Sequence, residues 1–558
     1  MAISNKKMIM TLDMQAKPEL DPRDIPRFRH KQKANVEEIL DDLGNYLINE
    51  RTMTVGPISD DERSTIINNT IVPFCFERFE KIVRSLSPNG LVEWLVRHNE
   101  SALREVAFHG LTIPTRVACF GSVVEVVERI REELPELSAT AMASRFVIEY
   151  IVAQPPTGIR PISLSVYDDL IALTVEMIDF GFESDLIHFN LANIKLAILP
   201  SGRLGTDRTS YSSAHDLFRS NAASEEISRA TKSFERHWGQ TNSASKKAAL
   251  LDQIDEAASK EFGHSLTELL NFLAEGMNIG KDISPTYAAL PVLELISRLA
   301  DRLAWQSAKV ENALDLLSLK PRADFLNPPT PHRLEDIVPW RFNRSLSYLR
   351  RPFLFRPTDQ GFEVAWGNRG LYSAWTYLIN LFMEGRLKAQ SLRLRQVLGE
   401  VNEINGEEFN DRVADMFETD ENLIVRRRVK KIGHLKLVAK NGDLGDIDVL
   451  VADVAKKIVW VVECKSLAVG RTPFEMTNEI TNLFRGKKGK ASVIERHQKR
   501  VDWVSQNLGA VLAWLNLDQS DSWRVEGRLV VDRELFTPYL AYSPMPVIAF
   551  HELHKALG

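Results

Sequence analysis

Two apolar segments separated by a four-residue gap constrain the fold of this chain more than any other feature of its sequence. The first segment is GDLGDIDVLVAD at residues 442–453, and the second is IVWVVECKS at residues 458–466. So short a gap permits a hairpin turn but not the crossover that a parallel pair needs, so we expect antiparallel strands. This pairing brings Asp448 near Glu463 at one edge of a sheet.

The second segment is an apolar strand that ends in charged residues. Because side chains alternate along a strand, Glu463 and Lys465 point to one face and Cys464 points to the other, as a small core residue. Asp448 and Glu463 offer the hard oxygen ligands that Mg²⁺ (or Mn²⁺) requires. A metal held there polarises a phosphoryl group and activates water, while Lys465 orients the nucleophile or offsets developing charge. The set is typical of phosphodiester hydrolysis; the alternative interpretation is a surface salt-bridge cluster.

These residues resemble the PD-(D/E)XK, or restriction-endonuclease-like, nuclease superfamily. Its signature is an acidic residue at a strand start, a short gap, and a second strand that ends in Asp/Glu-x-Lys. Asp448 matches the first acid, and Glu463-Cys464-Lys465 matches the second element. The preceding Gly445-Asp446-Ile447 is similar to the lead-in of several branches. The resemblance covers roughly residues 400–558 and implies an α/β domain with a mixed central sheet.

The resemblance also implies residues on two helices. Members often carry Gly-x-x-Phe-Glu on an N-terminal helix, where the glutamate lies beside the metal. This chain has Asn410 at that position, so Glu407, one turn earlier, is interpreted as the metal ligand in preference to Glu408. Branches also place a Gln or Lys on the helix after the motif, which assigns Gln498 to the catalytic set and Lys499 to the phosphate.

Basic residues gather around this motif. The formal net charge of the chain is −5, but residues 420–500 contain 18 Lys or Arg against 10 Asp or Glu. A local basic surface favours nucleic-acid binding, although a solvated basic face explains the same pattern. The residues assigned to this contact are Arg426, Arg428, Lys430, Lys487, Lys488, Lys490 and Lys499.

A chain of 558 residues exceeds one comfortable core, so we expect several domains. The predicted boundaries are a polar arm at 1–35, a mainly α-helical region at 36–327, a linker and helical connector at 328–400, and the nuclease-like domain at 401–558. The helical region is expected to serve recognition, regulation or partner binding. In the last domain, helices are expected at 406–418, 474–485 and 492–507, and strands at 423–429, 434–439, 446–452, 458–464, 509–515 and 524–531.

Other features narrow the class of protein. The three cysteines lie far apart, which excludes a disulfide framework and fits a cytoplasmic protein. We expect no membrane span. His551 and His554 are three residues apart, unlike the four of a metalloprotease helix, and are interpreted as surface residues. The arginines between Trp340 and Arg351 are assigned to packing between domains in preference to a phosphate-binding surface.

Taken together, the sequence predicts a Mg²⁺-dependent endonuclease, with DNA as the first choice of substrate. Chains of this build resemble bacterial restriction or phage-defence effectors. A protein partner or a homo-oligomer, formed through the helical region, is a further expectation. Two alternatives remain open: a non-catalytic module that binds nucleic acid or protein, and a nuclease subunit gated by a partner.

Overall fold

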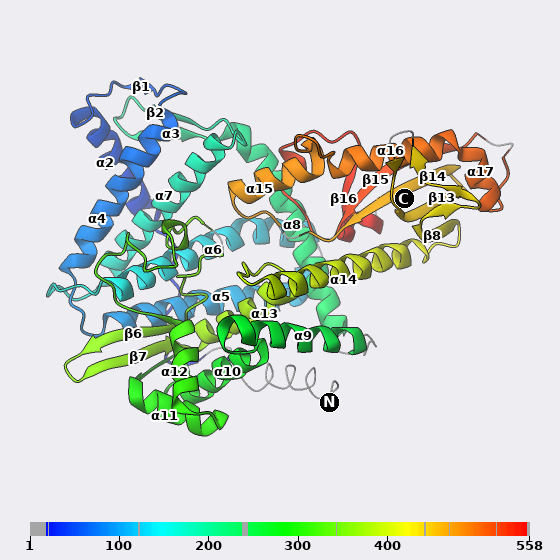
Figure 1. Cartoon of the computed structure of the whole chain (residues 1–558). Coiled ribbons are helices and arrows are strands. Elements are labelled where there is room, and N and C mark those ends of the chain that lie inside the picture. Colours follow the sequence, from blue (N-terminus) through cyan, green and yellow to red (C-terminus); the bar gives the residue numbers. More distant parts are fainter. Residues whose placement is uncertain are drawn as a thin grey trace. The chain divides into compact units, whose positions relative to one another are not determined.

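The chain folds into two compact units (Figure 1). In a computed structural model, unit 1 comprises Met1–Ser210 and Ala230–Leu398, and unit 2 comprises Tyr211–Arg229 and Gly399–Gly558. Helices and several sheets occur together, so the protein is a multidomain α/β protein. The structure describes residues 18–19, 22–120, 123–236, 244–341, 343–439, 442–467, 469–519 and 522–554, so the arm expected at 1–35 lies partly outside the described residues.

Unit 1 is built mainly of helices. Within it lie α2 (Lys33–Asn49), α3 (Arg63–Ile66), α4 (Val72–Ser85), α5 (Leu91–Phe120), α6 (Val123–Ala153), α7 (Leu164–His188), α9 (Ala244–Phe262), α10 (Leu266–Ile283), α11 (Val292–Leu303), α12 (Ser307–Leu316) and α13 (Asn368–Met383). Two further helices, α8 (Thr209–Arg236) and α14 (Leu392–Phe417), contribute residues to both units. None of the helices among the described residues has the length and apolar character needed to cross a membrane.

Helix α7 lies at the centre of unit 1, because nearly every face of it is apolar and buried. It packs against α2, α4 and α6 in one hydrophobic core. Its buried acids are held by residues from other segments: Asp168 forms an ion pair with Arg29, and Glu183 forms one with Arg208. Buried charges are tolerated only when paired, so these contacts fix the chain around α7.

Unit 1 also contains two small sheets that the sequence did not predict. The first has the order β1 (Gly56–Pro57), β2 (Lys195–Ile198), β3 (Leu204–Asp207). The second has the order β4 (Tyr287–Pro291), β7 (Gly361–Gly367), β6 (Phe353–Thr358), β5 (Ser318–Leu319). These strands have two to seven residues, too short for a period of two to stand out from the helical pattern around them.

Unit 2 contains a mixed five-stranded sheet. Its order is β16 (Val547–Ala549), β15 (Arg524–Val531), β14 (Ile458–Lys465), β13 (Ile447–Asp453), β8 (Leu423–Val429). Strands β8, β13 and β14 run antiparallel, whereas β14, β15 and β16 run parallel. Two short hairpins follow β8: β9 (Lys431–Ile432) with β10 (Leu435–Lys436), and β11 (Val438–Ala439) with β12 (Gly442–Asp443).

Helices cover both faces of this sheet (Figure 1). Helix α14 packs on one face through Phe409, Val413 and Phe417, against Val449, Val451 and Trp460. Helices α16 (Val493–Gln506) and α17 (Leu508–Trp514) pack on the other through Val501, Val504 and Val511, against Leu450, Ala452 and Val461. A further helix, α15 (Pro473–Ile480), lies between β14 and α16 in the sequence. Residues of opposite parity on β13 and β14 therefore meet different helices.

Two predicted strands of this domain differ from the structure: 434–439 is divided between the two-residue strands β10 and β11, and 509–515 is wrong. Residues 509–515 form most of α17 instead of a strand. Val511, Leu512 and Leu515 are buried at helical spacing against the sheet, so one face of a helix accounts for the apolar run. A short apolar run fits a buried strand or a buried helix equally well, and packing decides between them.

The arginine-rich segment 340–351 packs within unit 1. Arg344 is buried and donates from Nη1 to Glu149 Oε2 at 2.6 Å and from Nη2 to Oε1 at 3.1 Å. Glu149 also accepts a hydrogen bond from Tyr348 N, and Arg341 pairs with Asp185 on α7. These contacts place the segment in the core of unit 1.

Replacing Arg344 by methionine should lower the free energy of unfolding of unit 1 by about 3 kcal/mol, because Glu149 then stays buried without its guanidinium. Urea unfolding measures the change. The matched control is Arg393→Met, since Arg393 is exposed and should change stability by less than about 0.5 kcal/mol. Equal stabilities of the two variants would contradict the role given to this ion pair.

Candidate active site

The pairing of β13 with β14 brings the predicted acids together. The register pairs Val449 with Val462, so Asp448 and Glu463 are opposite each other one step further along. Directly opposite residues of an antiparallel pair have Cβ atoms about 4.5–5.5 Å apart. Asp448 Oδ2 also accepts a hydrogen bond of 2.8 Å from the backbone N–H of Cys464, which fixes one carboxylate oxygen at the strand end.

Glu463 lies at the centre of the site. It is 5% exposed, and three side chains approach its carboxylate. Lys465 Nζ lies 2.7 Å from Oε1, Arg500 donates from Nη1 to Oε2, and His497 Nδ1 lies 3.6 Å from Oε2. We call Asp448, Glu463, Lys465, His497 and Arg500 the strand-end site. Lys465 is 31% exposed at its side chain, so the site opens to solvent on the lysine side.

His497 and Arg500 come from α16, which crosses the same face of the sheet. A capping box fixes where the helix begins: Ser492 Oγ accepts from Glu495 N, and Glu495 Oε2 accepts from Ser492 N. His497 Nε2 contacts Val461 O at 3.0 Å, and Arg500 Nε donates to Leu444 O at 2.8 Å. His497 is thereby held against β14, and Arg500 against the segment that leads into β13.

Neither residue was assigned to the site from the sequence, although the helical pattern around them contains a signal. Ile494, Val501 and Val504 are buried, and 497 and 500 share their helical face. Gln498, which was assigned to the catalytic set, lies off this face: its Nε2 donates to Asp502 Oδ1 on the same helix at 2.9 Å. The helical phase therefore selects His497 and Arg500 over Gln498.

The charged groups of the strand-end site shift one another's pKa values. Burial and the neighbouring Glu463 raise the pKa of Asp448 to about 6. Burial alone would raise the pKa of Glu463, but Lys465 and Arg500 outweigh it and hold that pKa below its usual value. Burial lowers the pKa of His497, which keeps the ring neutral at physiological pH. A carbonyl only accepts, so Nε2 donates to Val461 O and Nδ1 keeps its lone pair toward Glu463.

The other metal ligand that the sequence assigned does not join this group. Glu407 is exposed on α14, the helix that packs on the opposite face of the sheet. Its backbone carbonyl, and not its carboxylate, accepts from Arg428 Nη2 at 3.3 Å. Asn410 and Glu408 lie on the same helix, beside the buried Phe409. The structure thus brings together Asp448, Glu463 and Lys465, with Glu407 placed elsewhere.

The basic residues assigned to nucleic acid divide into two kinds. Arg428 pairs with Asp411 on α14, and the Arg426 guanidinium lies 5.9 Å from the ring centroid of Trp514. The lysines of the second kind are exposed: Lys430 after β8, Lys499 on α16, and Lys487, Lys488 and Lys490 in the turn before α16. This turn is closed by backbone hydrogen bonds between Lys487 and Lys490. Lysines displayed this way can contact phosphates.

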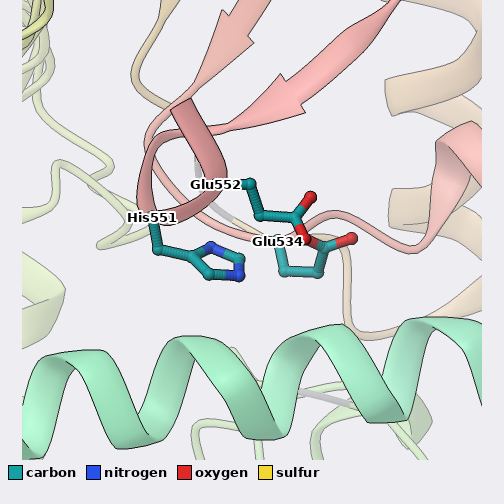
Figure 2. A group of neighbouring side chains, drawn as sticks. All are labelled: Glu534, His551 and Glu552. Atoms are coloured by element: carbon teal, nitrogen blue, oxygen red, sulfur yellow. The ribbon is translucent and has the colours of Figure 1, made fainter. Parts of the chain in front are cut away.

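A second group of ligand atoms lies at the ends of the neighbouring strands. Glu534 follows β15, and His551 and Glu552 follow β16; Figure 2 shows the two carboxylates side by side with the imidazole facing them. One ligand atom from each residue lies within 4.8 Å of the others, a set that can hold a divalent cation. Tyr539 donates to Glu534 at 2.5 Å, and burial raises the pKa of Glu534 to about 7. His551, interpreted as a surface residue, is half-buried in this group.

One comparison with known proteins places the chain in a family. A family model described as "Anti-phage protein Upx-like" matches residues 61–522. The match spans 462 of the 558 residues and includes the whole strand-end site. The comparisons with curated proteins and with solved structures gave no match.

Asp448→Asn should raise the Tm at pH 7.5, because the raised pKa means that the ionised carboxylate costs stability in the folded state. The cost grows as pH rises from the unfolded pKa near 4 to about 6 and is constant above it, about 3 kcal/mol in all. The amide oxygen still accepts from Cys464 N. Differential scanning fluorimetry from pH 4 to 8 measures the effect; a gain at pH 4 equal to that at pH 7.5 would contradict it.

Proposed function

Since this chain belongs to the Upx-like family of anti-phage proteins, we propose that it acts in phage defence by hydrolysing phosphodiester bonds of nucleic acid at the strand-end site. The single observation that carries the proposal is the pair Asp448 and Glu463, opposite each other on β13 and β14, with Lys465 on the same carboxylate. DNA is the first substrate to test.

The donor set of the site fits a divalent metal. Asp448 uses one oxygen for Cys464 N, which leaves Oδ1 available. His497 Nδ1 is buried and has no hydrogen-bond partner among the described residues. Two carboxylates and one imidazole nitrogen are ligands that Mn²⁺ and Mg²⁺ accept, with oxygen donors preferred by Mg²⁺. When bound, such an ion supplies Lewis-acid polarisation of the phosphoryl oxygen and a water of lowered pKa.

The cationic residues of the site suit a phosphate substrate. Lys465 carries its proton firmly, because Glu463 and Asp448 raise its pKa against the effect of burial. It can therefore orient a water molecule by donating to it and can offset the negative charge of the transition state. Arg500 presents a guanidinium, which binds phosphate oxygens bidentately. The exposed lysines before α16 supply sequence-independent attraction for a nucleic-acid backbone.

The architecture of unit 2 supports a restriction-endonuclease-like domain as part of this proposal. One helix, α14, precedes three antiparallel strands; α15, α16 and α17 follow, and the parallel strands β15 and β16 close the sheet. The acids lie at the junction of the antiparallel and parallel parts, on the α16 face. This order of elements agrees with the arrangement that the PD-(D/E)XK resemblance implies.

One observation favours a second candidate, a nuclease gated by a partner. Both oxygens of Glu463 are engaged, Oε1 by Lys465 and Oε2 by Arg500. A metal ion that binds Glu463 must displace part of this contact. A partner or substrate that draws Arg500 toward a phosphate would release Oε2 and switch the site on. In a non-catalytic module the same ion pairs would be purely structural.

Lys465→Ala should reduce cleavage at least about 100-fold, because the lysine both neutralises Glu463 and faces the solvent side of the site. The assay incubates the full chain with supercoiled plasmid, linear duplex, single-stranded DNA and RNA, with Mg²⁺, Mn²⁺ or EDTA. Lys195→Ala, which removes an exposed lysine of β2, is the matched control and should cleave like the wild-type protein. Metal-dependent cutting that survives in both Lys465→Ala and Glu463→Gln would refute the site.

Mn²⁺ binding should require Asp448 in its ionised form. Because the pKa of Asp448 is about 6, the affinity should fall roughly tenfold per pH unit below pH 6 and stay constant above it. Isothermal titration calorimetry measures the affinity. Asp448→Asn should lose this binding, whereas Glu534→Gln, which alters the second ligand group, should retain it.

The two assays together separate the candidates. Mn²⁺ binding without cleavage on any substrate would favour the gated nuclease. Neither binding nor cleavage would favour the interaction module, and full Mn²⁺ affinity in Asp448→Asn would remove the strand-end site from consideration.

A further inference from the structure

Unit 1 contains a cavity that has no part in the proposed nuclease reaction. It encloses about 480 Å³, within the range of small-molecule sites. Its walls come from α10, α13 and the segment around residues 331–351. Much of the lining is apolar and includes Leu269, Leu273, Leu378, Leu381 and Phe382. A cavity of this size and character suits a ligand with an apolar body.

Charged side chains also line the cavity, and the acids among them are mostly engaged by the protein. Glu261 accepts hydrogen bonds from Gln390 N, Ser391 N and Ser391 Oγ. Asp336 accepts from Arg333 N and Ser345 N. These carboxylates therefore hold backbone turns in place, and among the described residues neither forms an ion pair with Arg350 or Arg351.

Two adjacent arginines of the cavity wall, Arg350 and Arg351, differ in the hydrogen bonds that they form. Arg351 has a structural role: it donates to the carbonyls of Ser345, Asp315 and Ser318 at 3.0–3.2 Å. Arg350 lines the cavity, and among the described residues its guanidinium donates no hydrogen bond and forms no ion pair. Burial lowers the pKa of Arg350, with Tyr377 and Asp336 only partly opposing it.

Arg350 is half-buried, and its guanidinium has no acceptor among the described residues in a wall whose surface is mainly apolar, which is unfavourable for folding. Guanidinium groups removed from water need an acceptor, and their planar fork matches carboxylate and phosphate groups. Such a group is retained at a cost to stability where it binds something else. The apolar residues of the wall provide a surface on which the remaining, apolar part of that ligand can pack.

We propose that this cavity binds a small organic anion, whose carboxylate or phosphate pairs with Arg350 and whose apolar body packs against α10 and α13. The proposal is independent of the nuclease reaction, because every lining residue belongs to unit 1 and the strand-end site belongs to unit 2. It assigns unit 1 a ligand-binding function, which the family description does not mention.

Two fluorescent probes of nearly the same shape test the proposal on the full chain. Anilinonaphthalene sulfonate is anionic, and N-phenylnaphthylamine is its uncharged counterpart. The wild-type protein should bind the sulfonate at one site. Arg350→Met should weaken the sulfonate about tenfold, one ion pair's worth of affinity, and change the amine less than about twofold. Leu378→Trp, which fills the cavity, should weaken both probes, and Arg393→Met should change neither.

Melting temperatures separate a ligand-binding role from a structural one. Arg350→Met should melt at or above the wild-type temperature, because no hydrogen bond is lost, whereas Arg351→Met should melt lower. Competition by phenyl phosphate or by benzoate then distinguishes a phosphate ligand from a carboxylate ligand. Unchanged sulfonate affinity in Arg350→Met would overturn the proposal, as would a melting temperature below that of Arg351→Met.

Discussion

The carboxylate of Glu463, buried at the end of an apolar strand, is the charge on which unit 2 depends. Seven of the eight residues of β14 are buried, so the strand cannot release this charge to water without leaving the sheet. An isolated carboxylate there would cost several kcal/mol. Lys465 from the same strand and Arg500 from α16 remove that cost. The packing of α16 on the sheet therefore also neutralises Glu463, because Arg500 belongs to α16. His497 adds a hydrogen bond from α16 to Val461 O on the same strand.

The register of the hairpin is the second constraint. A one-residue slip between β13 and β14 would separate Asp448 from Glu463. A one-residue slip of β14 relative to α16 would turn Glu463 toward α14 and away from Arg500. Apolar residues pin the register: Leu450 and Ala452 must meet the α16 face, and Val449 and Val451 must meet α14. The core and the site thus specify each other, which explains why the pairing of the two acids could be predicted from the hydrophobic pattern of the two strands.

That pattern predicted much of unit 2 and the mainly helical character of unit 1, but not the two small sheets of unit 1. The hairpin and the two acids with their lysine follow from strand alternation and a four-residue gap, and the helix that becomes α16 follows from its helical pattern of apolar residues. What failed depends on tertiary context. The apolar pattern of residues 509–515 fits a strand and a helix equally well, and packing against the sheet favours the helix α17. Gln498 was chosen because of the family resemblance, whereas the face of α16 that packs on the sheet carries His497 and Arg500. The short strands of unit 1 form because distant segments meet, which no local window contains.

Glu463 in unit 2 and Arg350 in unit 1 are charged groups in opposite situations, and the contrast carries functional meaning. Glu463 has more cationic contacts than one carboxylate needs, so its environment is stable without a ligand and a reaction there must displace existing pairs. Arg350 has too few contacts, so its environment is incomplete without a ligand and binding adds an interaction without breaking one. A ligand of a charge that is already paired must displace one of its partners, whereas a ligand of an unpaired charge needs only to bind. The proposed hydrolysis in unit 2 is therefore expected to be restrained until a substrate phosphate draws on Arg500, whereas the proposed ligand of unit 1 would bind without breaking an existing ion pair.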